Sequence, residues 1–321
     1  MVSDKYIAGF LDSDGGIGFN FIDKGRKPLL GITWSQKTCQ DEVLFEIHKV
    51  IGGKIDYTTV NSVSYSRLHI CGRKAEALLN RIRKYLVIKR RFADSCMKIA
   101  NERVDNPIAI KEYLKKERKI TSLPIPNFPT RKWLAGYIDG DGCFSISEIS
   151  HKGAAYPLLH IAAANYDTEG IETIQKAFGG RIHNMNNGNV RQYILSLSPS
   201  KAIQLISYCG KYMIVKRDQA LFVLNCAKMG HYRDGKNIKL ALKQLKIQPH
   251  RLNEPRVDIK TLIAKIEDLP PYWNKKGAQA CKKCGLRVRK HVAFGLCGAC
   301  YQRSYRRNIS THVIVENVLS V

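Results

Sequence analysis

The sequence predicts an α+β protein built from two similar αββαββα units, each with a four-stranded antiparallel sheet, followed by a small cysteine-rich module. Three observations predict it: an internal repeat, strand-like alternation after each repeated motif, and four regularly spaced cysteines near the end. The 321 residues are enough for a duplicated domain with an appendage. Because 44% of them are hydrophobic and 9% aromatic, we expect most of the chain to pack into a core.

A repeat with a constant offset of 127 residues organises the chain, and it needs no gap over about 80 residues. The matching segments are Ile7–Gly15 with Leu134–Gly142, Gly52–Ile55 with Gly179–Ile182, and Tyr85–Arg90 with Tyr212–Arg217. Chance does not hold one register over such a length. Two similar units in one chain indicate a two-fold, pseudo-symmetric architecture.

Each unit opens with a short apolar helix, expected at Lys5–Asp12 and at Arg131–Asp139. Ser3 and Thr130 are suitable N-cap residues for these helices. The motif ends in an Asp-Gly pair that we expect to end each helix, and its glycine can take a positive φ.

Strands and further helices follow in the order ββαββα. Alternating apolar residues indicate strands with one buried face, and two consecutive glycines are expected to end the next helix. In the first unit the expected elements are strands Ile17–Phe21 and Ile32–Ser35, helix Asp41–Val50, a hairpin of Ile55–Thr59 with Ser64–Ile70, and two helices between Lys74 and Ala100. One face of the sheet should pack on helices and leave the other polar.

Changes in amino-acid composition along the chain predict the boundaries of its domains. The first unit is expected at residues 1–105 and the second at 130–232. A linker at 106–129 contains a charged helix, Ile108–Arg118, and a stiff proline-rich stretch, Leu123–Pro129. A basic connector at 233–275 contains two expected helices, Ile238–Lys246 and Val257–Leu269. The cysteine module is expected at 276–307, and a tail, 308–321, has no assigned role.

The charge of the chain restricts its partners. Lys and Arg number 53 against 27 Asp and Glu, a net charge of +26. Such an excess indicates a polyanionic partner, most commonly nucleic acid. A basic ribosome-like protein and a binder of anionic membranes are the alternatives. The apolar runs are too short to span a bilayer and the start does not resemble a signal peptide, so we expect a soluble intracellular protein without a membrane partner.

The repeated motif combines small residues with acids. Gly9 and Gly136 each cost a helix about 1 kcal/mol relative to alanine, which close packing of the two helices would offset. Asp14 and Asp141 would then meet at the base of the pair, where acids at helix C-termini oppose the helix dipole. Paired carboxylates under a basic surface suit Mg²⁺-dependent phosphodiester hydrolysis. The alternative is that Asp-x-Asp-Gly merely forms a turn.

Both motifs resemble the motif of LAGLIDADG homing endonucleases, and the resemblance covers about residues 5–230. It implies that Asp14 and Asp141 bind two or more catalytic Mg²⁺ ions, with the carbonyls of Ser13 and Gly140 as further ligands. Each aspartate would serve the cut in one strand across the minor groove, leaving short 3′ overhangs. The two sheets would form a DNA-binding saddle that contacts a long site in the major groove.

The resemblance also implies three further catalytic residues. Lys89 and Lys216 occupy matching positions near the expected active-site waters, where a cation could stabilise charge on the phosphate; a solvated helix end is the alternative. Gln36 matches a position that often orients a water. The second unit has Ala163 there, so Asn165 could substitute, or the two cuts could differ in rate.

Strand alternation predicts a polar sheet face for DNA, on which Arg and Lys suit guanine and Asn and Gln suit adenine. For each residue the alternative is an ordinary solvated side chain. The candidates are Asn20, Lys24, Lys27, Thr33, Ser35, Tyr65, Arg67 and His69 in the first unit, and Ser147, His151, His160, Arg181, His183, Gln192 and Ser196 in the second.

Four cysteines predict a structural zinc site. Cys281 and Cys284 form one Cys-x2-Cys pair, and Cys297 and Cys300 form another after a basic insert. This spacing is typical of tetrahedral Zn²⁺ sites, whose metal supplies the folding energy of a short segment. Disulfides or a redox dithiol are the alternatives. The module resembles small zinc fingers appended to phage and intron-encoded nucleases, which implies extra phosphate contacts. The six other cysteines are expected to be reduced and mostly packed.

These features predict a monomeric pseudo-dimer that makes a double-strand break in double-stranded DNA, as in intron homing. A group I intron maturase, which would bind its own intron RNA, and a non-catalytic DNA-binding regulator of the same fold are the alternatives. The two acids, Asp14 and Asp141, argue against pure regulation.

Overall fold

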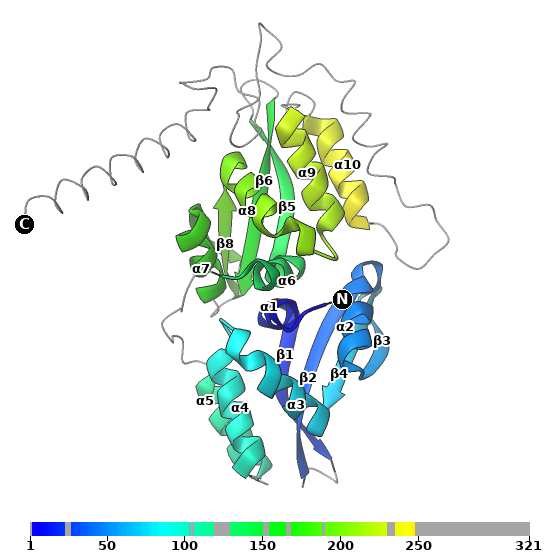
Figure 1. Ribbon diagram of the computed structural model, residues 1–321, viewed down its shortest axis with the longest axis vertical. Helices are drawn as coiled ribbons and strands as arrows, with labels where there is room; N and C mark the ends of the chain where they lie inside the picture. The colour runs from blue at the N-terminus through cyan, green and yellow to red at the C-terminus, as the bar shows by residue number, and fades with distance from the viewer. Residues whose placement is uncertain are drawn as a thin grey trace, which may run out of the picture.

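A computed structural model of the chain describes residues 2–22, 27–102, 104, 106–118, 129–149, 154–164, 168–187, 190–229 and 235–247. Within these residues, two four-stranded antiparallel sheets each carry helices on one face. The helices α1 and α6 lie side by side between the two sheets, seen nearly end-on in Figure 1.

The first unit has the strand order β1-β2-β4-β3. Its elements are α1 (Asp4–Asp14), β1 (Gly15–Ile22), β2 (Lys27–Lys37), the 3₁₀ helix η1 (Thr38–Gln40), α2 (Glu42–Ile51), β3 (Lys54–Val60), β4 (Val63–Cys71), α3 (Arg73–Ile82), the 3₁₀ helix η2 (Arg83–Tyr85), α4 (Arg90–Glu102) and α5 (Pro107–Glu117).

The second unit has the matching order β5-β6-β8-β7. Its elements are α6 (Arg131–Asp141), β5 (Gly142–Ile149), β6 (Ala154–Ala164), α7 (Glu169–Phe178), β7 (Arg181–Asn187), β8 (Val190–Leu197), α8 (Pro199–Cys209), the 3₁₀ helix η3 (Gly210–Tyr212), α9 (Arg217–Met229) and α10 (Gly235–Ile247). The offset of 127 residues therefore relates whole elements, from α1 with α6 to α4 with α9.

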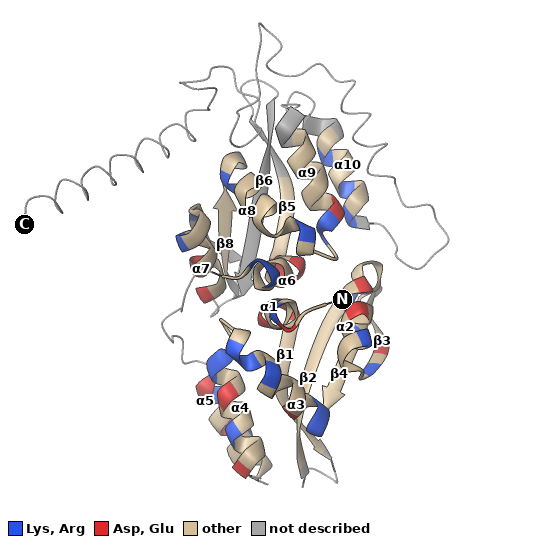
Figure 2. Ribbon diagram, viewed as in Figure 1, with Lys and Arg blue, Asp and Glu red and all other residues tan. Residues whose placement is uncertain are grey.

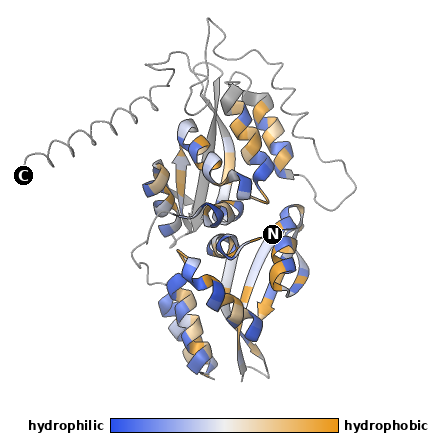
Figure 3. Cartoon of the chain, in the orientation of Figure 1, coloured by the Kyte–Doolittle hydropathy of each residue, from blue (hydrophilic) through white to orange (hydrophobic). Residues whose placement is uncertain are grey.

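The expected alternation along the strands is confirmed in the first sheet. Ile32, Trp34 and Leu68 are completely buried, whereas the intervening Thr33 and Ser35 are partly exposed. Antiparallel pairing places Ile32 opposite both Ile17 and Ile70, so the apolar positions of three strands share one face. Apolar residues also line one side of α10, where orange and blue alternate in Figure 3.

The expected double-glycine helix ends are confirmed. Gly52 and Gly53 follow α2 with φ of 67° and 111°, and Gly179 and Gly180 follow α7 with φ of 74° and 119°. A side chain at Gly53 would also approach the His69 carbonyl oxygen to 2.8 Å. Only glycine accepts both the left-handed backbone and this close approach.

A fifth helix extends each unit beyond the recognised repeat. In α5, which lies in the segment expected to be a linker, Ile110 and Leu114 are buried and the helix packs against α4. In α10, Ile238 and Leu242 are buried and the helix packs against α9, β5 and β6. These buried positions correspond with an offset of 128 residues, one more than in the rest of the repeat.

Two expectations about the motif helices are corrected by the structure. Each motif helix continues two residues further, to Asp14 and to Asp141. Gly15 and Gly142 have φ of −98° and −72° rather than positive values, because each begins a strand directly. A side chain at Gly15 would instead crowd Leu11, since its Cβ would lie 2.8 Å from the Leu11 Cα.

The expectation for the cysteines is also corrected in part. The six cysteines within the described residues are free, and three are buried: Cys96, Cys209 and Cys226. Burial raises the pKa of the Cys96 and Cys226 thiols to about 12. Cys71 and Cys143 are instead exposed, because each lies on a strand at a position away from the core.

Some expected elements lie outside the described residues. These are the proline-rich stretch up to residue 128, the helix at Val257–Leu269, the cysteine module and the tail. Among the described helices, none combines the length and the apolar character needed to cross a membrane.

Candidate active site

The two motif helices approach each other through their glycines. A Cβ on Gly9 would overlap the Trp133 carbonyl oxygen and lie 2.8 Å from its carbon, and one on Gly136 would overlap the Tyr6 carbonyl and lie 2.9 Å from the Phe10 nitrogen. Ala8 and Ala135 are completely buried beside them. The expected close packing of these helices is therefore confirmed, and it brings their C-terminal ends together.

The N-terminal ends of both helices are capped as expected. The Ser3 hydroxyl accepts a hydrogen bond from the Tyr6 backbone nitrogen at 3.4 Å, and the Thr130 hydroxyl accepts one from the Trp133 nitrogen at 3.3 Å. These contacts satisfy one otherwise unpaired backbone donor in each helix.

The first aspartate of each motif joins the two units. The Trp133 indole Nε1 donates to Asp12 at 2.8 Å, and the Tyr6 hydroxyl donates to Asp139. Tyr6 and Trp133 are related by the repeat offset, so each unit supplies an aromatic donor to the buried acid of the other. Sequence analysis missed this role, although two hydrogen-bonding aromatics at matching positions were a usable signal.

The same two aspartates anchor the loop that precedes the last helix of the repeat. Asp12 accepts backbone N–H groups of Val87 at 2.7 Å and Lys89 at 2.8 Å. Asp139 accepts those of Ile214 at 2.6 Å and Lys216 at 2.9 Å. Burial raises the pKa of both carboxyls, and these hydrogen bonds partly oppose the rise.

Lys89 and Lys216 lie under the C-terminal ends of the motif helices. Lys89 Nζ donates to the carbonyls of Leu11, Asp12 and Gly15 at 2.7 to 2.9 Å, and to that of Ser13 at 3.2 Å. A cation at a helix C-terminus is favourable because it faces the negative end of the dipole.

Lys216 has the equivalent contacts in the second unit. Its Nζ donates to the carbonyls of Ile138, Asp139 and Gly140 at 2.8, 2.7 and 2.6 Å. Burial lowers the pKa of Lys216, although the nearby carboxylates of Asp139, Asp14 and Asp141 favour its charged form. The ammonium groups therefore lie next to the expected site, and their direct partners are helix carbonyls.

Asp14 and Asp141 belong to one cluster. Lys216 interacts electrostatically with both carboxylates. A Cβ on Gly140, the residue before Asp141, would lie 3.2 Å from Asp14 Cγ. The Gln36 side-chain amide donates to Asp14 Oδ2. Burial raises the pKa of Asp14, and the attraction of Lys216, the Gln36 hydrogen bond and the attraction of Lys89 oppose it without outweighing it.

The two halves of the cluster differ at the position of Gln36. The equivalent residue, Ala163, is paired with Tyr193 and has no side-chain amide. Asn165, the suggested substitute, lies outside the described residues. The carboxylate of Asp14 therefore has a glutamine partner, whereas the equivalent position in the second unit, 163, has an alanine.

The sheet of the first unit brings most of its candidate DNA-contacting residues to one face. Thr33 is paired with His69 and Ser35 with Arg67, and the Asn20 amide lies 2.9 Å from His69 Nε2. The strand register also places on this face four residues that sequence analysis missed: Lys37, Lys54, Asp56 and Thr58. Lys24 is outside the described residues, and only the backbone of Lys27 is described.

The second sheet aligns its candidates in the same way. Ser196 is paired with both His160 and Arg181, while Gln192 and His183 lie at positions of the same parity. Ser147 falls on this face by its register. Only the backbones of Ser147 and His160 are described, and His151 lies outside the described residues.

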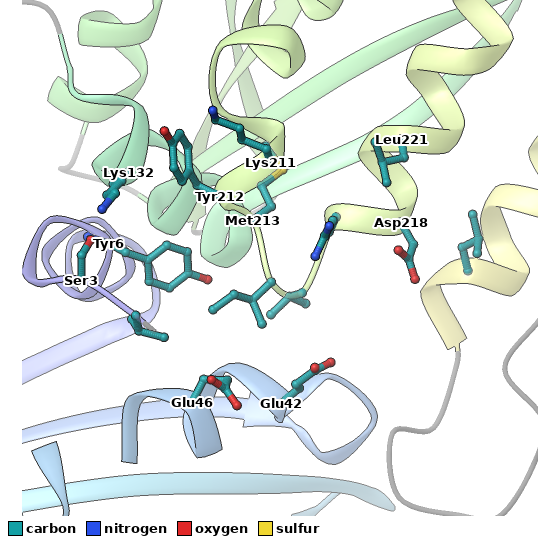
Figure 4. A pocket seen from close by; sticks show the side chains of 15 residues that line it. Ser3, Tyr6, Glu42, Glu46, Lys132, Lys211, Tyr212, Met213, Asp218 and Leu221 are labelled. Carbon is teal, nitrogen blue, oxygen red and sulfur yellow. The ribbon is translucent and has the colours of Figure 1, made fainter. Parts of the chain in front are cut away.

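A polar cavity lies beside α1 and the loop that leads into α9, and neither Asp14 nor Asp141 lines it. It has a volume of about 570 Å³ and is lined by Tyr6, Glu42, Glu46, Lys132 and Asp218 among others (Figure 4). Tyr6 is eight residues before Asp14, which is about 12 Å along a helix. We therefore do not assign the chemistry to this cavity.

The donors around Asp14 and Asp141 fit Mg²⁺. In the part of the chain that the structure describes, no group of three or more His, Cys, Asp or Glu side chains could hold a metal ion. Mg²⁺ does not need such a group, because it keeps several waters and often uses one or two carboxylates with substrate phosphate oxygens. Burial already raises the pKa of Asp14, and a cation beside it would favour its ionised form.

The structure thus has two antiparallel sheets with matching strand orders, joined by a close helix pair that ends in two carboxylates. The fold is that of LAGLIDADG homing endonucleases. A family model described as LAGLIDADG endonuclease matches residues 134–227, which form most of the second unit.

Solved structures support the same fold over most of the chain. The LAGLIDADG homing endonuclease I-GzeII in complex with its DNA target is similar with a TM-score of 0.53 and 16% identity, covering 86% of this chain and 100% of that one. The LAGLIDADG meganuclease I-AabMI bound to uncleaved DNA has a TM-score of 0.54 and 17% identity, covering 76% and 98%. I-SmaMI bound to an uncleaved DNA target with calcium ions has a TM-score of 0.51 and 14% identity, covering 83% and 98%.

Proposed function

We propose that this protein is a site-specific DNA endonuclease that makes a double-strand break in a long recognition site. The observation that carries the proposal is the meeting of Asp14 and Asp141 at the end of a glycine-packed helix pair that joins two polar-faced sheets. The net charge of +26 and the basic residues spread over the helices of both units (Figure 2) suit a polyanionic substrate. The similar proteins crystallised with DNA support the same substrate.

The carboxylates of Asp14 and Asp141 would hold divalent cations, with the carbonyls of Ser13 and Gly140 as further ligands. These carbonyls accept hydrogen bonds from Lys89 and Lys216, and a carbonyl oxygen has a second lone pair available. When bound, the metal would lower the pKa of a water and neutralise charge on the scissile phosphate. Each aspartate would serve one strand, and cuts across the minor groove would leave short 3′ overhangs.

The chain's own residues would prepare this chemistry. Lys89 and Lys216 hold the helix ends through their carbonyls and add positive charge beside the carboxylates. Gln36 fixes the orientation of Asp14 and would direct a water with its remaining hydrogen-bonding capacity. Asp12 and Asp139 keep both lysine-bearing loops in place.

Two polar sheet faces would bind duplex DNA, and the cysteine module would add phosphate contacts beyond them. Because one chain supplies both acids, a monomer would suffice for both cuts.

We propose one structural Zn²⁺ held by Cys281, Cys284, Cys297 and Cys300. Metal analysis of the purified protein should find one zinc per chain. The variant with Cys281→Ser and Cys284→Ser should lose it and, with it, part of the salt dependence of DNA binding.

Two conservative variants test the active-site assignment. Asp14→Asn and Asp141→Asn should each abolish the double-strand break in Mg²⁺, while a gel-shift assay should show binding to the same duplex. Asp94→Asn is the matched control, because Asp94 is an exposed acid on α4. Cleavage of both strands by either active-site variant would refute the assignment.

The alternative functions separate in the same assays. Binding without cleavage by the unaltered protein would favour a regulator or a maturase. A maturase would then accelerate splicing of a group I intron transcript, whereas a regulator would not.

A further inference from the structure

The second active-site half contains a lysine that has no counterpart in the first. Lys246 lies in the last turn of α10, and its Nζ lies 3.4 Å from the Cys143 Sγ. Cys143 follows Asp141 by two residues and is close enough to Lys216 to interact with it electrostatically. A third ammonium group is therefore present beside the Asp141 end of the cluster.

The packing of α10 against its neighbours fixes the position of Lys246. Ile238, Ala241, Leu242 and Leu245 bury one side of α10, which packs against β5, β6 and α9. Its last turn also reaches the first unit, because Gln40 Nε2 donates to the Lys246 carbonyl at 3.3 Å. In Figure 1 α10 runs beside α9, with its C-terminal end toward the junction of the two units.

The ammonium of Lys246 reaches the polar side of the second sheet. Cys143 is exposed and is paired with His160, which in turn is paired with Ser196. All three positions therefore belong to the face proposed for DNA. A thiol is a weak hydrogen-bond acceptor, so Cys143 would release the lysine to a phosphate oxygen at little cost.

Among the residues that the structure describes, the first unit has no equivalent lysine. The residue that corresponds to Lys246 with the 128-residue offset is Arg118, the C-cap of α5, whose guanidinium lies 5.0 Å from the centre of the Phe92 ring. Gly16 stands in place of Cys143, and a Cβ added there would have only the Thr33 carbonyl oxygen, at 3.9 Å, within 4 Å. The first half thus has Gln36 beside its acid, and the second half has Lys246.

We propose that Lys246 contacts the DNA phosphate at the cut served by Asp141. Lys246 would then assist the cut in one strand, and Gln36 the cut in the other. The proposal rests on the proposed endonuclease function. The ammonium would lie near charge that develops on the phosphate, where a positioned positive group lowers the barrier. Lysine suits this position as a compact charge on a flexible stem.

Strand-resolved cleavage tests the proposal. Lys246→Met should slow one strand at least about tenfold and leave the other unchanged, so that nicked DNA accumulates. Gln36→Ala should slow the opposite strand, about 10- to 100-fold, because it removes a group that orients a candidate metal ligand. Lys243→Met is the matched control, an exposed lysine on the same helix that should change neither rate.

A second measurement does not depend on cleavage. The DNA-binding constant is measured at several salt concentrations with Ca²⁺ in place of Mg²⁺, on a duplex that carries the cleavage site of the protein. This constant should fall with salt less steeply for Lys246→Met than for the unaltered protein. One lost phosphate contact should reduce the slope of log K against log salt by about 0.9. A merely structural lysine would leave this slope unchanged.

The outcomes separate the two proposals. Slowing of both strands equally, slowing of the same strand as in Gln36→Ala, or an unchanged salt slope would overturn the role of Lys246. If the unaltered protein cuts neither strand, the endonuclease proposal fails. In that case the salt slope on a random-sequence duplex alone decides whether Lys246 contacts phosphate.

Discussion

Asp12 and Asp14 are separated by one residue, but their surroundings differ. Asp12 accepts three hydrogen bonds, from Val87, Lys89 and Trp133, and is buried. Asp14 is less enclosed and faces the shared cluster with Asp141 and Lys216. Charge-assisted hydrogen bonds therefore assign the first acid to the fold, whereas the second remains suited to chemistry.

The buried acid should matter for stability. Asp12→Ala should lower the free energy of unfolding by about 3 kcal/mol, because it leaves one buried and two partly buried donors without their acceptor. Urea denaturation monitored by circular dichroism measures the change. Asp4→Ala, at a partly exposed acid in the same helix, is the control. A loss below about 1 kcal/mol for Asp12→Ala would contradict the anchoring role, because exposed sites commonly change stability by no more than about 0.5 kcal/mol.

Substitution of Asp14, the second acid of the motif, should change the free energy of unfolding in the opposite direction. Burial raises the pKa of Asp14 in the folded chain. Its ionisation therefore costs stability as pH rises through the folded pKa, and this cost is absent below the unfolded value of about 3.9. In EDTA at pH 7, Asp14→Asn should stabilise the protein by about 1 kcal/mol. Thermal unfolding across pH checks this: the gain should shrink as pH falls, and a destabilised variant at pH 7 would contradict it.

The helix pair is the element that brings the acids together. Gly9 and Gly136 each face a backbone carbonyl of the opposite helix, so neither can be enlarged without moving the helices apart. This geometry explains why poor helix formers occur inside both helices. It also couples stability to function, because any separation of α1 from α6 would separate Asp14 from Asp141.

An added methyl group tests this packing. Gly9→Ala should destabilise the protein by about 3 kcal/mol, the upper range for overpacking a close contact. Gly18→Ala is the matched control, because nothing lies within 4 Å of its added Cβ, and it should change stability by less than about 0.5 kcal/mol. Equal unfolding midpoints for the two variants would contradict the close approach.

The repeat in the sequence predicted the order of helices and strands, since one offset relates α1–α4 to α6–α9. It missed the relation between α5 and α10 because one inserted residue changes the offset. Hydropathy alone also could not show that Gly15 is extended, since that depends on the strand beginning directly after Asp14.

For the candidate site, sequence motifs identified Asp14, Asp141, Gln36, Lys89 and Lys216. The structure brings the last three into hydrogen-bond contact with residues at the ends of the motif helices. Gln36 contacts Asp14 directly. The matching positions of Tyr6 and Trp133 were a signal for a shared role, but their partners in the opposite unit depend on the packing of α1 against α6. The place of Lys246 could not be predicted, because it depends on the packing of α10.

Across the whole molecule, two related halves support one site with unequal residues. Gln36 has no counterpart at Ala163, and Lys246 has none beside Gly16. A single chain permits such differences because each half can change independently, whereas a symmetric homodimer repeats every residue. The asymmetry concerns only a few side chains, since the sheets keep matching strand orders.

The most direct test of the central claim is to map cleavage without assuming a target. The purified protein would be incubated in Mg²⁺ with fragments of the genome that carries its gene, and every new DNA end would be sequenced. The account predicts ends clustered at one long site with short 3′ overhangs, and their disappearance with Asp14→Asn or Asp141→Asn. Absence of new ends, while salt-sensitive binding to DNA persists, would contradict the assignment of an endonuclease.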